Sequence, residues 1–247
     1  MDDNPPPERP PPQLLETIGN LAEFHREHEK FYSQAPLRTS ADIQAASRVL
    51  KALGARWSEA TPSEHPAASP LAGAEDLNAP GLTAETGVLF MEGQGEPAEI
   101  KRIRRDLDTV AGDMDQTATW LSAAMEQAWQ VAGALAAYPA LADLLGERHR
   151  IIGNDWQSAS LQGLAGRLIR RALELLDRID FSPEAVRADL AGGRHNAAYL
   201  YSASELLDRA ADLIAESSTL VHENEPRWRK FGDRVRQLRA TSGPDPE

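Results

Sequence analysis

Residues 97–138 read PAEIKRIRRDLDTVAGDMDQTATWLSAAMEQAWQVAGALAAY. Apolar or small side chains recur along this stretch in alternating steps of three and four residues. They are Ile100, Ile103, Leu107, Val110, Met114, Thr117, Leu121, Ala124, Ala128, Val131 and Leu135. This spacing is a heptad repeat of about five heptads, which is typical of a long helix packed against other helices. The alanines and the threonine predict close packing between the helices.

The C-terminal part of the chain carries a second heptad series over residues 196–240. Its inward positions are Tyr199, Ala203, Leu206, Ala210, Leu213, Ser217, Val221, Asn224, Trp228, Phe231, Val235 and Leu238. Pro226 should kink this helix without ending it. We expect a further helix over about 148–180 and a short one that begins at Pro183. Together these segments predict an all-α protein, an elongated antiparallel helical bundle with long heptad-patterned helices.

The N-terminal region predicts two shorter helices. Residues 13–34 and residues 39–57 each place apolar side chains at helical spacing, and Pro36 lies between them. Because proline disfavours a helical conformation in the residue before it, we expect the first helix to end there. The sequence therefore predicts an N-terminal helical hairpin.

Proline and charge mark the proposed domain boundaries. Residues 1–12 contain six prolines, and residues 59–99 contain eight acidic residues and no lysine or arginine. Segments of such composition do not favour a packed core. The resulting division is a disordered proline-rich tail over 1–12, a helical hairpin over 13–58, an acidic flexible linker over 59–96, a long helical bundle over 97–240 and a disordered tail over 241–247.

Composition excludes several classes of function. The chain has no cysteine, so it has no disulfide, no cysteine-ligated metal and no cysteine nucleophile. Its net charge of −12 arises in the linker and the two tails, so it does not decide whether nucleic acid is a partner. The longest non-polar run, residues 131–138, is far shorter than the roughly 20 residues that a membrane span needs. We expect a cytoplasmic protein with no cofactor and no membrane span.

Two histidines and a glutamate on the first predicted helix form a candidate ligand or metal site. His25, His28 and Glu29 lie within one helical turn of one another. They could begin a metal site or supply a general base, or the histidines could simply hydrogen-bond at the edge of a core. One helix supplies too few ligands by itself, and no histidine follows a glutamate at the Glu-x-x-His spacing of ferritin-like bundles. We favour the structural interpretation.

A second polar cluster lies in residues 147–158. His149, Asn154 and Asp155 are its ligand candidates, and Asn154, Asp155, Ser158 and Gln162 follow the spacing N-D-x-x-S-x-x-x-Q. This spacing resembles the second metal motif of terpene synthases, but Gln162 replaces the acid that ends that motif, and no Asp-Asp-x-x-Asp precedes it. The resemblance would imply a magnesium-dependent isoprenoid enzyme. The favoured alternative is a helix start at which Asn154 or Asp155 caps the backbone, and an interaction or ligand site is the third.

The last predicted helix carries a basic cluster that we regard as a candidate interaction surface. The cluster contains one acid, Asp233, two aromatic residues and six cations, which are Arg227, Arg229, Lys230, Arg234, Arg236 and Arg239. The interaction candidates within it are Arg227, Trp228, Arg229, Lys230, Phe231 and Arg234. A cluster of cations and aromatic rings could bind an acidic protein, an anionic lipid or nucleic acid, or it could be a solvated helix face. No known nucleic-acid-binding motif accompanies it, so nucleic acid is not the expected partner.

The leading functional hypothesis is a non-enzymatic interaction or scaffold protein with a protein partner, and a homodimer is one form of it. The alternative is a helical-bundle enzyme or a small-ligand or metal-binding protein. That alternative would use His25 and His28 together with the 147–158 cluster. Whether the chain catalyses any reaction is left open.

Overall fold

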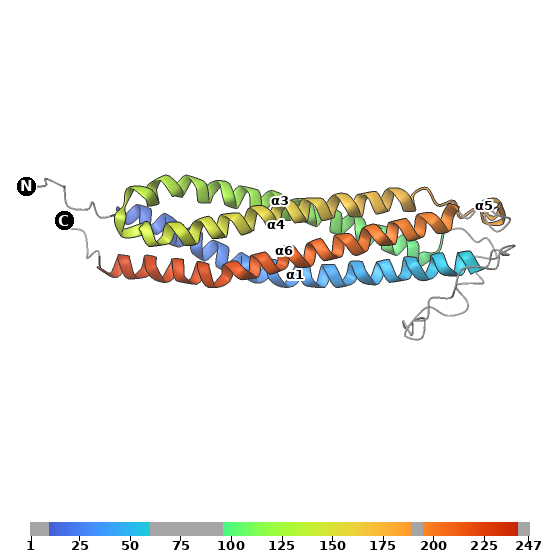
Figure 1. Cartoon of the computed structure of the whole chain (residues 1–247), viewed down its shortest axis with the longest axis horizontal. Helices are drawn as coiled ribbons and strands as arrows, with labels where there is room; N and C mark the ends of the chain where they lie inside the picture. The colour runs from blue at the N-terminus through green and yellow to red at the C-terminus, as the bar shows by residue number, and fades with distance from the viewer. Residues whose placement is uncertain (1–9, 60–95, 189–194, 242–247) are drawn as a thin grey trace, which may run out of the picture. The chain divides into compact units, whose positions relative to one another are not determined.

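The computed structural model describes residues 10–59, 96–188 and 195–241. Within those ranges the side chains of residues 24–38, and of some other helical positions, are not described. All elements in the described ranges are helical. They are α1 (Pro12–Glu59), α3 (Ala98–Ala137), the 3₁₀ helix η2 (Pro139–Leu141), α4 (Ala142–Leu176), α5 (Pro183–Ala188) and α6 (His195–Thr241). The predicted all-α class is confirmed (Figure 1).

Local sequence signals account for several helix ends. The carbonyl of Pro97 accepts a hydrogen bond from the Lys101 amide at the start of α3. Pro139 occupies the first turn of η2, where its missing amide proton is not needed. The Ser182 hydroxyl caps α5 by accepting a hydrogen bond of 3.2 Å from the Ala185 amide. Pro226 lies inside α6, which continues on both sides of it as expected.

The predicted break at Pro36 is wrong, because α1 is a single helix of 48 residues. Both halves of α1 pack against α6. Before the proline, Gly19 lies against Val235, and after it the Ser40 hydroxyl donates to the Ala211 carbonyl over 2.9 Å. These contacts oppose the local helix-breaking tendency of proline. The prediction of a helix end at Pro36 considered only that local tendency. The N-terminal hairpin is therefore replaced by one long helix.

The chain forms two compact units, each of which draws on all four long helices, α1, α3, α4 and α6. Unit 1 comprises Met1–Ala41, Asp113–Gly166 and Ala211–Glu247, and unit 2 comprises Asp42–Gly112 and Arg167–Ala210.

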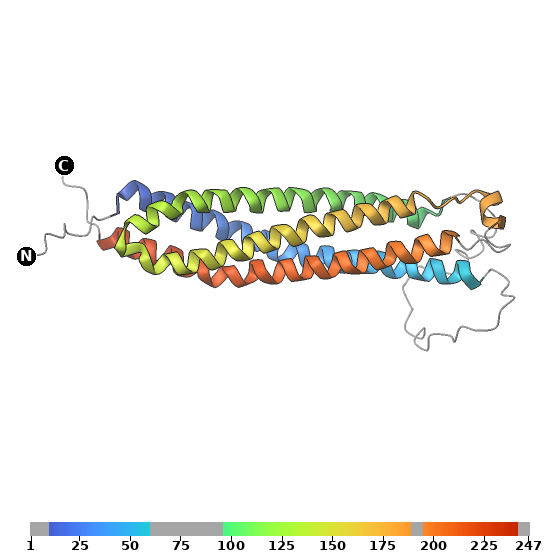
Figure 2. The ribbon, with the colours of Figure 1, turned by 45° about the horizontal axis from the view of Figure 1, so that its top comes forward.

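In unit 1 the buried core is formed by side chains of all four long helices. Its members are Leu15, Ile18, Ala22, Leu135, Leu141, Leu144, Ile151, Trp228, Phe231 and Val235. The rings of Trp228 and Phe231 meet edge to face, with centroids 5.7 Å apart. Helices α4 and α6 lie side by side in both views (Figures 1 and 2). Asn154 of α4 bonds to Asn224 of α6, whereas Ser158, later in α4, contacts Ser217, earlier in α6. These two helices are therefore antiparallel in this unit.

In unit 2 small residues allow α1 and α6 to approach closely. The Ser47 hydroxyl donates to the Ser204 carbonyl over 3.0 Å, and a Cβ at Gly54 would lie only 3.2 Å from the ring of Tyr201. Glycine at this position therefore allows the aromatic ring to pack directly on the α1 backbone. Elsewhere in the unit, Arg104 of α3 forms an ion pair with Asp177 at the end of α4 over 3.0 Å.

None of the helices in the described ranges has a stretch both long and apolar enough to cross a membrane.

Candidate functional site

Asn224 of α6 lies at the centre of a buried polar network that connects α6 to α4. Its side-chain nitrogen donates to the Asp155 carboxylate over 2.8 Å and to the Ile151 carbonyl over 3.3 Å. Its side-chain oxygen accepts a hydrogen bond of 3.0 Å from Asn154, which also donates to the Leu220 carbonyl. Asn224 is 0% exposed, so this amide satisfies its hydrogen-bonding groups entirely within the protein.

One further turn along α4, a second polar group continues the connection to α6. The hydroxyls of Ser158 and Ser217 are 2.6 Å apart, and the Gln162 amide donates to Ser217 over 2.8 Å. All three side chains are buried. The Gln162 side-chain oxygen has no hydrogen-bond partner in the described part of the chain. We call the six side chains of these two groups the α4–α6 polar ladder; they are Asn154, Asp155, Ser158, Gln162, Ser217 and Asn224.

Asp155 is the one ionisable side chain of the α4–α6 polar ladder, and its pKa is shifted from the ordinary value. Burial raises the pKa of Asp155 from 3.8 to about 7, and the hydrogen bond from Asn224 opposes that rise. A carboxyl group with a pKa near neutrality can act as an acid or base, but it must reach a reacting atom to do so. Asp155 is 5% exposed and bonds to Asn224. Its present geometry serves the contact between α4 and α6.

The favoured prediction of a helix cap at Asn154 or Asp155 is wrong. Both residues lie in the interior of α4, which begins twelve residues earlier at Ala142. Their side chains instead contact α6. The sequence identified the correct polar residues but not their partners, because the partners lie about 70 residues further along the chain.

His149 and Arg148 occupy different environments although they are neighbours in the sequence. His149 is exposed, and its ring nitrogen Nδ1 lies 2.7 Å from the Leu145 carbonyl of its own helix. Arg148 is 3% exposed, and its three guanidinium nitrogens have no hydrogen-bond partner in the ranges that the structure describes. The guanidinium lies 5.5 Å from the ring centroid of Trp129, which is itself 54% exposed. Burial lowers the pKa of Arg148.

His25, His28 and Glu29 lie in α1, but their side chains fall outside the described part of the structure. Whether they approach the 147–158 cluster therefore stays a prediction. Among the side chains that are described, no three of the histidines, aspartates and glutamates are grouped so that they could hold a metal ion.

The basic cluster on α6 is largely paired with acidic residues. Glu147 of α4 lies 2.8 Å from Lys230 and 3.9 Å from Arg227. The hydrogen bond from Lys230 lowers the pKa of Glu147. In the same way, Arg234 lies 3.2 Å from Asp143 of α4. These cations therefore join α4 to α6 across their surface.

The remaining members of the cluster divide between the core and the surface. Phe231 is 2% exposed and belongs to the core of unit 1. Trp228 is also buried, although its ring lines a groove between α1 and α6. Arg229 is exposed and pairs with Glu225 of the same helix.

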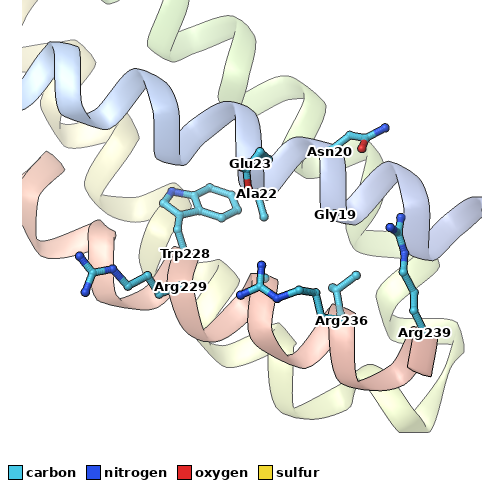
Figure 3. Close-up of a pocket in the computed structure, with 10 residues that line it drawn as sticks. Gly19, Asn20, Ala22, Glu23, Trp228, Arg229, Arg236 and Arg239 are labelled. Carbon is cyan, nitrogen blue, oxygen red and sulfur yellow. The ribbon is translucent and has the colours of Figure 1, made fainter. Parts of the chain in front are cut away.

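This α1–α6 groove has a volume of about 260 Å³ (Figure 3). Figure 3 shows Arg236 and Arg239 extending from α6 toward α1, with the Trp228 ring between the two helices. The lining residues are Gly19, Asn20, Ala22 and Glu23 of α1 and Trp228, Arg229, Gly232, Val235, Arg236 and Arg239 of α6. Arg236 and Arg239 belong to the basic cluster predicted from the sequence but were not among its interaction candidates, and neither glycine was a candidate. The signal that could have found them is the spacing of positions 229, 232, 236 and 239, which places them on one face of a helix.

Comparison with protein-family models, with curated proteins and with solved structures found no match to this chain.

Proposed function

We propose that this chain is a non-enzymatic interaction or scaffold protein, built on an elongated antiparallel bundle of heptad-patterned helices. The observation that supports the proposal is that the side chains of the α4–α6 polar ladder bond to one another between α4 and α6. The side chains best suited to chemistry in the 147–158 cluster, those of Asn154 and Asp155, are engaged with Asn224 inside unit 1. The same unit has a groove lined by arginines at its surface.

The proposed partner is a protein. Three cations of the α6 cluster are paired with α4 carboxylates, which reduces the positive potential that a nucleic-acid phosphate backbone would need. A homodimer is one form of the proposal, since heptad faces can pair between chains as well as within one.

The proposal is tested by capturing partners on the tagged full-length chain in cells of its source, followed by mass spectrometry. Light scattering on the purified chain then measures self-association over a range of concentrations. We expect a reproducible protein partner, a concentration-dependent dimer or both. A chain that stays monomeric and retains no protein reproducibly would contradict the proposal.

A small-ligand-binding protein is the second candidate, and the observation in its favour is Arg148. A buried guanidinium with no hydrogen-bond partner among the described residues is costly, and an anionic ligand would relieve that cost. Elemental analysis and native mass spectrometry of the purified chain separate this candidate from the first. A stoichiometric metal or small molecule, together with a melting temperature that falls when it is removed, would favour ligand binding.

A further inference from the structure

The α1–α6 groove is open partly because α6 has a glycine, Gly232, in its interior. Glycine in the middle of a helix costs about 1 kcal/mol relative to alanine. Among the described residues, a Cβ at Gly232 would meet only the Arg236 guanidinium, at 3.9 Å. The packing of the fold therefore does not require glycine here, and the absence of a side chain leaves space within the groove.

Gly19 on the opposite wall has a different role. A Cβ at this position would lie 3.2 Å from the Nη2 atom of Arg239 and 3.6 Å from Val235. The glycine therefore lets the Arg239 guanidinium lie against the α1 backbone (Figure 3). A side chain here would displace the guanidinium from the groove.

The arginines of the groove are available to carboxylates from outside the chain. Arg239 forms no ion pair with any described residue. Arg236 pairs with Asp233 and Arg229 with Glu225, but both pairs lie within α6 and are exposed. Exposed pairs of this kind contribute about 0–1 kcal/mol, so an incoming carboxylate can replace them at little cost.

The rest of the lining suits a short peptide segment better than a continuous polyanion. Trp228 and Val235 line the groove but are only 3% and 1% exposed, and Glu23 places a negative charge in it. A phosphate backbone or a charged membrane would meet that carboxylate, whereas a peptide can place its carboxylates at the arginines and an uncharged residue beside Glu23. A planar guanidinium fits a carboxylate through two parallel hydrogen bonds.

From these observations we propose that the α1–α6 groove binds an acidic peptide segment of a partner protein. Carboxylates of that segment bind Arg236 and Arg239, and one apolar side chain of it fills the space beside Gly232. This inference rests on the proposed interaction function and names the surface and the chemistry of the partner.

The test uses the full-length chain and a fluorescein-labelled ten-residue peptide that carries two glutamates beside one central leucine among glycines and serines. A peptide with glutamine in place of every glutamate is its control. We expect the glutamate peptide to bind at least tenfold more tightly than the glutamine peptide. Equal binding of the two peptides, or no binding of the glutamate peptide, would overturn the proposal.

Variants of the chain then test whether the peptide binds in the α1–α6 groove. Gly232→Leu fills the groove. Gly153→Leu is its matched control, because a Cβ at Gly153 of α4 has no neighbour within 4 Å in the described part of the chain. We expect Gly232→Leu to weaken peptide binding at least fivefold, and Gly153→Leu to change it less than twofold. Circular dichroism should show that both variants keep their helix content. Equal peptide affinities for the two variants would show that the groove is not the site.

Charge variants and competitors identify the ligand chemistry. The double variant Arg236→Gln and Arg239→Gln should weaken binding at least fivefold, whereas Arg105→Gln, an exposed position on α3, should not. Displacement of the peptide by inorganic phosphate at low millimolar concentration, or by anionic vesicles, would assign the groove to a different ligand.

If Gly232→Leu still retains the partner captured by the wild-type chain, this inference fails while the interaction function stands. If no partner is captured at all, the proposed function fails.

Discussion

At the scale of single residues, Asp155 links the stability of unit 1 to pH. Its folded-state pKa of about 7 lies above the ordinary value of 3.8. Well below pH 3.8 the carboxyl group is protonated in both the folded and the unfolded chain, so its burial has no ionisation cost. As the pH rises toward 7, the unfolded chain ionises while the buried group stays protonated. The contribution of Asp155 to stability is therefore lost as the pH rises through this range.

Replacing Asp155 with asparagine should remove this pH dependence. The shift of about three pKa units corresponds to at most about 4 kcal/mol, and we expect Asp155→Asn to stabilise the fold by about 2 kcal/mol at pH 8. At pH 4 the variant and the wild type should differ much less than at pH 8, because the buried carboxyl group is then neutral and the unfolded one is only partly ionised. Urea unfolding followed by circular dichroism at both pH values measures the difference. The same stability difference at pH 4 and pH 8 would show that Asp155 does not titrate as described.

Arg148 is the second residue whose burial has a measurable consequence. Methionine matches the length of its aliphatic chain and has no charge to bury. Since replacing a buried charge that has no partner among the described residues with an apolar side chain removes a desolvation cost, we expect Arg148→Met to stabilise the fold by about 1–3 kcal/mol. Loss of the contact with Trp129 should offset about 1 kcal/mol of this gain.

Thermal unfolding of Arg148→Met measures the effect, with Arg150→Met as the control at an exposed position of the same helix. The control should change stability by less than about 0.5 kcal/mol. A strongly destabilised Arg148→Met would mean that the guanidinium has a partner in the folded protein.

At the scale of elements, the α4–α6 polar ladder should control how firmly these two helices are joined. Asn224→Ala removes a hydrogen-bond donor from Asp155 and an acceptor from Asn154. Because it leaves buried polar groups unsatisfied, we expect it to cost about 2–4 kcal/mol of unfolding free energy. Thr219→Ala is the control, since the Thr219 hydroxyl is exposed and bonds only within α6.

A double-mutant cycle tests whether Asn224 and Asp155 act together. The double variant with Asp155→Ala should be more stable than the sum of the two single changes predicts, because the carboxylate that lost its donor is also gone. Additive costs would show that the two side chains contribute independently, and would argue against a connected ladder.

The same elements show what the sequence could and could not predict. Its heptad series assigned Ser217 and Asn224 to the inward face of α6, and its polar cluster included Asn154 and Asp155. Their pairing depends on the register between α4 and α6, which neither helix specifies by itself. The groove depends on Gly19 of one helix and Gly232 of another, which are 213 positions apart, so no local pattern indicates it.

Pro36 illustrates a limit of local rules within one element. Proline disfavours helix by removing a hydrogen bond, and that rule predicted a hairpin. The rule fails because contacts with α6 hold α1 on both sides of the proline, at Gly19 and at Ser40. In contrast, Pro183 begins a helix as predicted, and α6 continues through Pro226 as predicted; the kink at Pro226 stays a prediction.

At the scale of the whole molecule, composition was enough to predict the all-α class, because alanine and leucine at helical spacing leave few alternatives. The function was not predictable to the same degree. A surface that recognises a partner requires only a few side chains on helices that fold for other reasons. The homodimer and the His25 and His28 site remain predictions.

The central claim is that the molecule acts by holding a protein partner at its surface while its buried polar groups maintain packing. The most direct measurement compares partner capture by three full-length chains expressed at equal levels: the wild type, Gly153→Leu, and a triple variant with Gly232→Leu, Arg236→Gln and Arg239→Gln. We predict the same partner on the wild type and on Gly153→Leu, and its loss from the triple variant. Capture of no partner by the wild type, together with a monomer by light scattering, would contradict the account.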